Sequence, residues 1–403
     1  MKKVRGIAVA VLLLHALFVP APVCAQDEIR ILDSSVVAEF PLRLTFKLSA
    51  ESAVNITDIR LCYQVVRESF ADVTSEAFLS FTPGRRVDVS WTLEMLKIGG
   101  LPPGTVLDYW WLVMDADGRA HLATKPASVK FNDLRYPWQS LSANGITLYW
   151  YDGDRAFAEE LMASAVDALA RLKGDTGATL AKPVELYIYA NSNDLRGSMI
   201  NPQEWTGGVA FSRHGIITIG IAKNGLEWGK RAVAHELTHL VVHQVTANPY
   251  HDLPTWLDEG LAMHTEGPLG ADFASYLNKA VTEGGLISVR SLASPFSAYS
   301  DRSYLSYAES FSIVDFLIGK YGQEKMLELL LAIREGNSYD GALQKVYGFD
   351  MDGLNTIWQN YIRQPARIPD AGGVPILRIA AKAVFFLVMA PCMRIYPVDG
   401  AGF

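Results

Sequence analysis

Cysteine is scarce in this sequence of 403 residues, which contains only three cysteines. Cys24 lies close to the N-terminus, and Cys62 and Cys392 lie in widely separated regions. Two distant thiols do not make a disulfide framework, and they cannot form a cysteine-rich metal site. The fold must therefore be stabilised by hydrophobic cores, for which half of the residues are hydrophobic.

The chain also lacks an excess of positive charge. Its 36 Lys and Arg residues are outnumbered by 43 Asp and Glu residues, which gives a net charge of −7. A nucleic-acid-binding protein typically carries a basic surface. We therefore expect no nucleic-acid partner.

A further absence is a clean apolar run long enough to cross a membrane. The tail 366–403 is apolar, but Arg378, Lys382 and Arg394 interrupt it, and its longest clean run is Ala383–Met393. This run is shorter than the roughly 20 residues of a membrane-spanning helix. Membrane attachment is not favoured, and a weak anchor in this tail is the alternative.

The N-terminus has the pattern of a secretory signal peptide. Lys2, Lys3 and Arg5 precede the apolar run Ile7–Val19, and cleavage is expected near Ala25. The sequence thus predicts a signal peptide at residues 1–25 and a bacterial protein that is secreted or extracytoplasmic.

The segment 26–135 shows the period of two that is typical of half-buried strands. Leu42, Leu44, Phe46 and Leu48, for example, alternate with polar residues. About 100 residues of this pattern predict an all-β, immunoglobulin-like sandwich without the usual cysteine pair. No cluster of catalytic residue types occurs here, so a spacer, cleft wall or binding module is expected.

The segment 140–365 has a mixed pattern. Strands are predicted at Ile146–Tyr151 and Val184–Tyr189, and between them lies an Ala-rich helix, Asp154–Lys173, capped by Asp154. The remainder is predicted to be helical, with helices at 230–247, 272–283, 307–320, 324–334, 338–346 and 351–363. A small sheet with a helical lobe predicts an α+β domain.

The run His235-Glu236-Leu237-Thr238-His239 lies within one of these helices. Side chains four residues apart share a helix face, so His235 and His239 can bind one ion together. A catalytic zinc site takes three N or O ligands and leaves one position open, and His, His, Glu is an established set. Glu259 is the natural third ligand of a single Zn2+, and Glu236 is placed to act as the base.

The other histidines fit this site less well. Metzincins take a third histidine six residues after the second, but Val245 occupies that position. His243 lies about 12 Å along the helix from His235, too far to share an ion easily. His243 is expected to support the site or to pack, and His214, His251 and His264 are expected to have structural or surface roles.

Three segments resemble a known family: HELTHLVVHQ, LPTWLDEGLA and YAESFSIVDFLIGKYG. They are similar to peptidase MA-like gluzincins, and the resemblance covers roughly residues 150–361. It implies a zinc metallopeptidase acting on peptides or proteins, with Glu259 as third ligand and Tyr307 donating to the oxyanion. From the residues alone, Tyr304 would serve as well as Tyr307.

The aminopeptidase branch of these proteins has a GxMEN-like segment, which is missing before the HELTH motif, so endopeptidase activity is favoured. In its place, 204–211 and 215–222 are predicted to form a hairpin. Its first strand is expected to be an edge that pairs with an extended peptide. Alternatively, Gly207 and Gly208 are simple turn residues.

The sequence is compatible with two functions. The favoured one is an exported metallopeptidase that uses His235, His239, Glu259, Glu236 and Tyr307. The alternative is a non-catalytic binding or scaffold protein that keeps a zinc-stapled fold. A purely structural zinc site usually closes its fourth position with another protein ligand, which disfavours the alternative.

Overall fold

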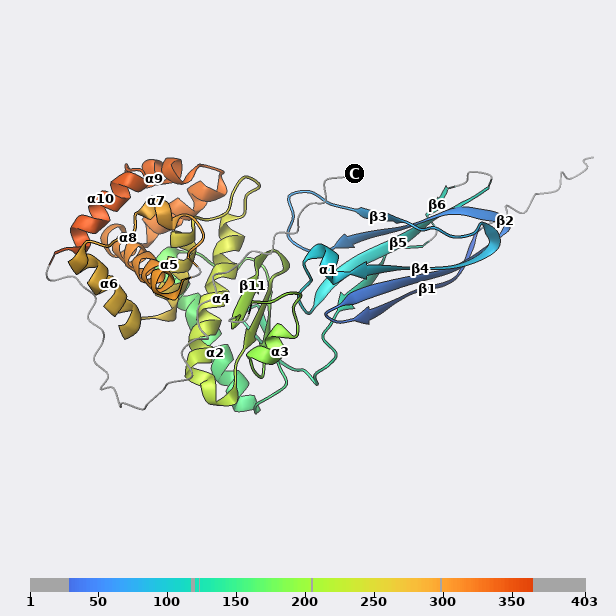
Figure 1. Ribbon diagram of the computed structural model, residues 1–403, viewed down its shortest axis with the longest axis horizontal. Coiled ribbons are helices and arrows are strands. Elements are labelled where there is room, and N and C mark those ends of the chain that lie inside the picture. The colour runs from blue at the N-terminus through green and yellow to red at the C-terminus, as the bar shows by residue number, and fades with distance from the viewer. Residues whose placement is uncertain (1–28, 117–119, 123, 204–205, 298, 365–403) are drawn as a thin grey trace, which may run out of the picture.

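The computed structural model describes residues 29–364 except 117–119, 123, 204–205 and 298. Figure 1 shows an all-β part, formed by the N-terminal residues, beside a larger part in which helices accompany a second sheet. The predicted signal peptide and apolar tail lie outside the described residues, as does Cys392.

Seven strands and one short helix build the N-terminal part. They are β1 (Arg30–Glu39), β2 (Arg43–Val65), β3 (Ser75–Phe78), β4 (Gly84–Glu94), α1 (Met95–Ile98), β5 (Thr105–Asp115), β6 (Ala120–Leu122) and β7 (Ala127–Phe131). The 23-residue strand β2 connects them, because its first half pairs with β1 and β4 and its second half with β3 and β5. β5 pairs in turn with β6 and β7.

The predicted alternation is confirmed for β2, but the predicted pair of separate sheets is wrong. Leu44, Phe46 and Leu48 are at most 2% exposed, whereas Leu42, which precedes the strand, is 58% exposed. All seven strands join one hydrogen-bonded sheet. A sandwich would require β2 to end midway, but it continues as one strand. Its pairing with β4 shifts after Glu51, and such irregularities bend a strand, so that its second half pairs with other strands. The result is one bent sheet around one core instead of an immunoglobulin-like sandwich.

The second sheet has five strands in the order β11-β12-β10-β9-β8. Its elements are β8 (Gln139–Ala143), β9 (Ile146–Trp150), α2 (Arg155–Thr176), β10 (Val184–Tyr189), α3 (Ser192–Arg196), β11 (Gly208–Phe211), η1 (Ser212–His214), β12 (Ile216–Gly220), η2 (Lys223–Gly225) and α4 (Leu226–Thr246). The three inner strands are parallel, and the two outer strands, β8 and β11, run antiparallel to their neighbours.

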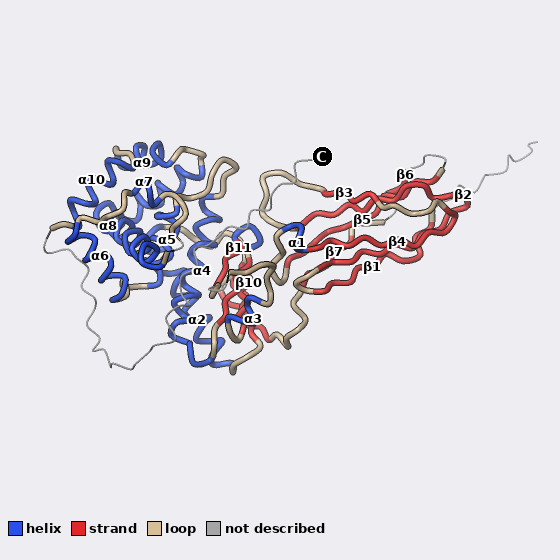
Figure 2. The backbone as a smooth tube through the Cα atoms, in the orientation of Figure 1, coloured by secondary structure: helices blue, strands red, loops and turns tan. Residues whose placement is uncertain are grey.

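Local sequence accounts for most of these elements. The Asp154 side chain accepts a hydrogen bond from the amide of Phe157 at 2.9 Å, which caps α2 as predicted. In β10, Leu186 and Ile188 face the large core shared with α2 and α4, while Tyr187 and Tyr189 join an aromatic cluster on the opposite face. The sheet is therefore covered on both faces, and α4 lies along one of them (Figure 2).

The remaining helices form a lobe beyond α4. They are α5 (Thr255–Glu266), α6 (Ala271–Glu283), α7 (Val289–Leu292), α8 (Ser300–Arg334), α9 (Tyr339–Tyr347) and α10 (Met351–Ile362). The two helices predicted at 307–320 and 324–334 are parts of α8, which contains a break at Gly322, where φ is 83°. The predicted start at Tyr307 is wrong, because α8 begins seven residues earlier. Within the described residues, no helix has the length and apolar character that spanning a membrane requires.

Candidate metal centre

Helix α4 positions the first three candidate residues. Val233, Ala234, Leu237 and Leu240 are all at most 2% exposed, so this helix is held in the core on more than one side. His235 and His239 lie one turn apart, and His239 is itself only 2% exposed. The packing leaves the two imidazoles little freedom to move apart.

Helix α5 brings the fourth residue, Glu259, which is 3% exposed. Its neighbour Gly260 faces α8 so closely that an added Cβ would lie 2.5 Å from the backbone oxygen of Ser310. Only glycine permits this approach of two helix backbones. The short distance between α5 and α8 thus depends on Gly260, the residue that follows Glu259.

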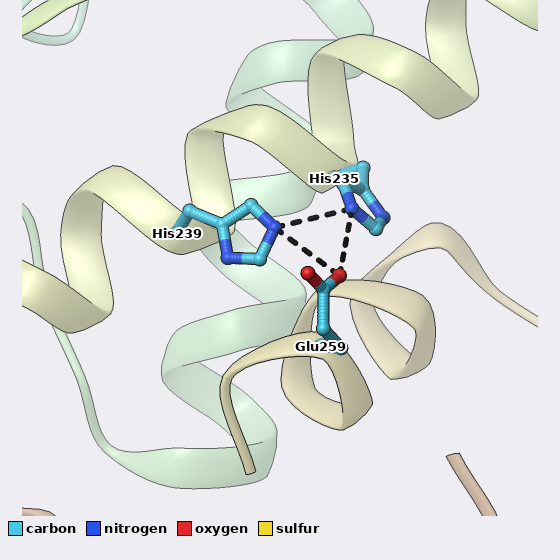
Figure 3. Close-up of side chains that lie close together, drawn as sticks. All are labelled: His235, His239 and Glu259. Atoms are coloured by element: carbon cyan, nitrogen blue, oxygen red, sulfur yellow. Dashed lines mark hydrogen bonds and ion pairs between the residues drawn. The ribbon is translucent and has the colours of Figure 1, made fainter. Parts of the chain in front are cut away.

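His235, His239 and Glu259 converge in a triangle (Figure 3). The two Nε2 atoms are 3.1 Å apart, and Oε2 of Glu259 lies 3.4 Å from that of His235 and 3.6 Å from that of His239. Ligand atoms about 2.0–2.1 Å from a tetrahedral zinc ion are roughly 3.3–3.4 Å from one another. The three separations bracket this value, so the residues fit one zinc ion.

Two polar features agree with this fit. Oε2 of Glu259 is buried and accepts no hydrogen bond from the described residues, which is costly unless a cation approaches it. Moreover, each histidine uses its other ring nitrogen for a carboxylate: Nδ1 of His235 lies 2.7 Å from Glu266, and Nδ1 of His239 lies 2.8 Å from Asp258. Both Nε2 atoms are thereby left facing the triangle, as in carboxylate–histidine–zinc arrangements.

The supporting carboxylates are themselves held in place. Glu266 also accepts from Arg231 at 3.0 Å, and Asp258 also lies 3.0 Å from Nε2 of His243. His243 therefore contacts the site through Asp258, in the supporting role expected from sequence. His239, His243 and Asp258 are close enough to suggest a second metal group. We interpret them instead as a hydrogen-bonded chain, because both contacts have ordinary hydrogen-bond lengths.

The charges of the cluster balance one another. Burial lowers the pKa of His235, but its interactions with Glu259 and Glu266 outweigh this and raise the pKa to about 10. Burial raises the pKa of Glu259, yet the two imidazoles bring it below its usual value. A buried pair of carboxylate-backed imidazoles thus favours a positive species in its centre, either protons or a metal cation.

Glu236 differs from the other acidic residues of the site. Burial raises its pKa, and His235 and His239 offset only part of this effect. It makes no hydrogen bond or ion pair with any described residue. A Cβ added to Gly208 would lie 2.7 Å from its Oε1, so the carboxyl group lies directly against β11.

Among the residues that the structure describes, β11 is the outermost strand of its sheet and pairs with β12 alone, through Gly208–Phe211 and Ile216–Ile219. The predicted hairpin and its position at an edge are confirmed. One side of this strand thus offers backbone groups for pairing next to Glu236.

Tyr307 lies two turns inside α8, is fully buried and packs edge-to-face on Phe296, with 5.1 Å between ring centroids. It is one turn before Ser310, the residue that Gly260 touches, so α8 carries it to the same helix junction as Glu259. Tyr304 instead stacks on Tyr276, at 5.4 Å. Of the two tyrosines considered, Tyr307 is the one in the core.

The other histidines contact residues away from the triangle. His251 bonds the backbone oxygen of Asn337 at 3.0 Å, and His264 lies 3.4 Å from Asp175. Sequence reasoning missed the supporting roles of Asp258 and Glu266. The spacing could have indicated the role of Glu266, because this residue follows Glu259 by seven residues, which is two helical turns along the same face.

The fold and the donor set define a class: an α+β protein with a buried His-His-Glu site suited to a single metal ion. Residues 164–364 match the Peptidase MA superfamily, and this part of the chain is a Peptidase MA superfamily domain. The match includes all four residues of the motif and Tyr307. No match was found among curated proteins.

Several solved structures are similar to parts of the chain. Aminopeptidase A of Legionella pneumophila, in complex with aspartic acid, shares 10% identity at a TM-score of 0.39, covering 82% of this chain and 49% of that one. An M1 zinc metallopeptidase from Deinococcus radiodurans shares 11% identity at a TM-score of 0.34, covering 86% and 96%. OgpA from Akkermansia muciniphila shares 11% at a TM-score of 0.21, covering 26% and 28%. The chain thus spans about half of the Legionella protein and about a quarter of OgpA.

Proposed function

We propose that this protein is an exported zinc-dependent metallopeptidase that hydrolyses peptide bonds within a peptide or protein substrate. The observation that carries the proposal is the triangle of His235, His239 and Glu259, whose separations suit one tetrahedral ion. The Peptidase MA superfamily match supports the same function.

His235, His239 and Glu259 would hold the ion, with Glu266 and Asp258 orienting the imidazoles. A bound zinc ion supplies a Lewis acid that lowers the pKa of water and polarises a carbonyl group. Glu236 has the properties of a general base, since burial raises its pKa above the usual value and no described residue bonds to its carboxyl group. It would take a proton from water and later pass a proton to the leaving amine.

Two further parts of the site would bind substrate. The free edge of β11 would pair with an extended peptide and bring the scissile bond beside Glu236. Tyr307 would donate a hydrogen bond to the oxygen that becomes negative in the transition state, as the family resemblance implies. An open-ended strand edge suits internal bonds, which supports endopeptidase activity over aminopeptidase activity.

Glu236 also distinguishes catalysis from a purely structural site. Its carboxyl group is half-buried and has a pKa raised by burial, yet it forms no hydrogen bond or ion pair with a described residue, so it does not help to hold the fold together. A non-catalytic scaffold would gain nothing from keeping it, whereas a hydrolase needs it.

Replacement of Glu236 by glutamine tests the proposal. We expect zinc content near one ion per chain in both proteins, and hydrolysis of a peptide library only by the unchanged protein. Glu227→Gln is the matched control, because Glu227 lies on the same helix with its side chain 87% exposed. Hydrolysis that survives Glu236→Gln would remove the proposed base, and absence of hydrolysis by the zinc-loaded protein would favour a binding role.

Export is part of the proposal and rests on the N-terminal sequence pattern. Mass spectrometry of the protein from a bacterial host should find a chain that begins near Gln26 outside the cytoplasm. An intact Met1 in the cytoplasm would contradict it.

A further inference from the structure

A group of basic side chains lies at the end of β11 that is distant from Gly208. Arg213 and His214 belong to η1, which directly follows β11, and Arg67 belongs to the segment 66–74 that joins β2 to β3. The amide of Glu68 donates a 2.6 Å hydrogen bond to the backbone oxygen of Arg213. This bond joins the N-terminal part to the segment that follows β11. We call Arg67, Arg213 and His214 the basic cluster.

His214 is the half-buried imidazole of the basic cluster. Burial, followed by the charges of Arg67 and Arg213, lowers its pKa to about 4, so it is neutral at pH 7. Its Nε2 atom is buried and has no hydrogen-bond partner among the described residues. Unsatisfied buried polar atoms are rare in proteins and often mark a site where a ligand or water binds.

The guanidinium groups of Arg67 and Arg213 have no carboxylate partner among the described residues. Glu68, which follows Arg67 in the sequence, is already paired with Lys182 at 2.7 Å. A local excess of positive charge is unusual in a chain whose net charge is −7.

The distance between Glu236 and the basic cluster can be estimated from the length of β11. Gly208 touches Glu236, and Phe211, the last residue of β11, precedes η1. At about 3.3 Å per residue, β11 spans roughly 10 Å. A peptide extended along this edge would thus reach the basic cluster about three or four residues from the bond that is cut.

We propose that the basic cluster is a specificity subsite that binds a carboxylate of the substrate, three or four residues from the scissile bond. Arginine pairs form short, charge-assisted hydrogen bonds with carboxylates, and Nε2 of His214 is an additional polar partner. The carboxylate belongs either to an acidic side chain or to the C-terminus of the substrate. The subsite rests on the proposed peptidase function, and segment 66–74 of the N-terminal part helps to form it.

Matched peptides test the subsite. Each fluorogenic peptide has one cleavable bond and carries either Glu or Gln at a single position, two to five residues from that bond on either side. Each peptide is made with a free and with an amidated C-terminus. We expect kcat/KM to be at least about tenfold higher with Glu at one position, or with the free C-terminus, which identifies the source of the carboxylate. In the double variant Arg67→Gln/Arg213→Gln this advantage should disappear. Peptides that carry Gln and an amidated C-terminus should still be cleaved.

Arg85→Gln is the control, because Arg85 is an exposed arginine of the N-terminal part that forms no ion pair with a described residue. It should keep the full preference. Arg213→Glu should reverse the preference towards Lys at the same position, a result that a loss of folding cannot produce.

Binding separates failure of the subsite from failure of the function. The same peptides are titrated into Glu236→Gln by fluorescence anisotropy, where Kd should show the same dependence on the carboxylate. If no peptide is cleaved but this dependence holds, the peptidase proposal fails and the subsite stands. If Glu and Gln peptides, free and amidated, behave alike, or if the preference survives in the double variant, the subsite is refuted.

Discussion

Replacing Gly208 by alanine tests whether the position of Glu236 matters for catalysis. A Cβ at residue 208 would lie 2.7 Å from Oε1 of Glu236, whereas ordinary contacts begin at 3.4 Å. The carboxyl group must therefore retreat by several tenths of an ångström. It can do so at little cost, because it is the end of a flexible side chain.

The expected effects on activity and on stability differ. A displacement of about 1 Å in a reacting group can lower the rate by roughly 10²-fold. We therefore expect kcat to fall about 10- to 100-fold. Stability should change by less than about 1 kcal/mol, because alanine restricts the unfolded chain and offsets the crowding in the strand.

The assay is kcat on one fluorogenic peptide, measured together with zinc content and denaturant unfolding. Gly174→Ala is the control, because a Cβ at Gly174 meets nothing within 4 Å. Unchanged kcat in Gly208→Ala would refute the assigned position of the base. A parallel loss of zinc would show that β11 acts on the metal ligands instead.

Three further changes have defined outcomes. Gly260→Ala places a Cβ 2.5 Å from the Ser310 backbone oxygen, which cannot move aside, so the free energy of unfolding should fall by about 1–3 kcal/mol; an unaltered denaturation curve would contradict this. Burial raises the pKa of Glu309 to about 8, so stability is full below the unfolded pKa near 4.3 and is lost by roughly 1.4 kcal/mol per pH unit up to pH 8. Glu309→Gln should thus stabilise the protein by a few kcal/mol more at pH 8 than at pH 5, and an equal effect at both pH values would disprove the assignment. Asp258→Asn removes the charge beside His239 and should weaken zinc binding about 10- to 100-fold in a chelator competition; wild-type affinity would exclude the supporting role.

The candidate metal site was predictable because most of it depends on spacing within single helices. The positions of His235, Glu236 and His239 on one helix follow from a repeat of 3.6 residues per turn. The approach of Glu259 was predicted only from the donor chemistry and the family resemblance, since nothing local fixes how α5 meets α4. The supporting bonds to Asp258 and Glu266 were missed, because an acidic residue on a helix has many possible partners.

The fold was predictable where a segment has one buried face. Val184–Tyr189 and the capped helix after Asp154 agree closely with the structure. The pairing of strands was less accessible: alternation shows that β2 is a strand, but it cannot show that one long strand passes through both halves of the sheet. The end of one predicted helix at residue 320 and the start of the next at residue 324 also agree with the structure, in which α8 is broken at Gly322.

The most direct test of the central claim is an anomalous-scattering map of the purified mature protein at the zinc edge. We predict one zinc ion bound by Nε2 of His235, Nε2 of His239 and Oε2 of Glu259, at about 2.0–2.2 Å from each. A protein without stoichiometric zinc, or an ion held by His243 and Asp258 while Glu259 stays outside bonding distance, would contradict it.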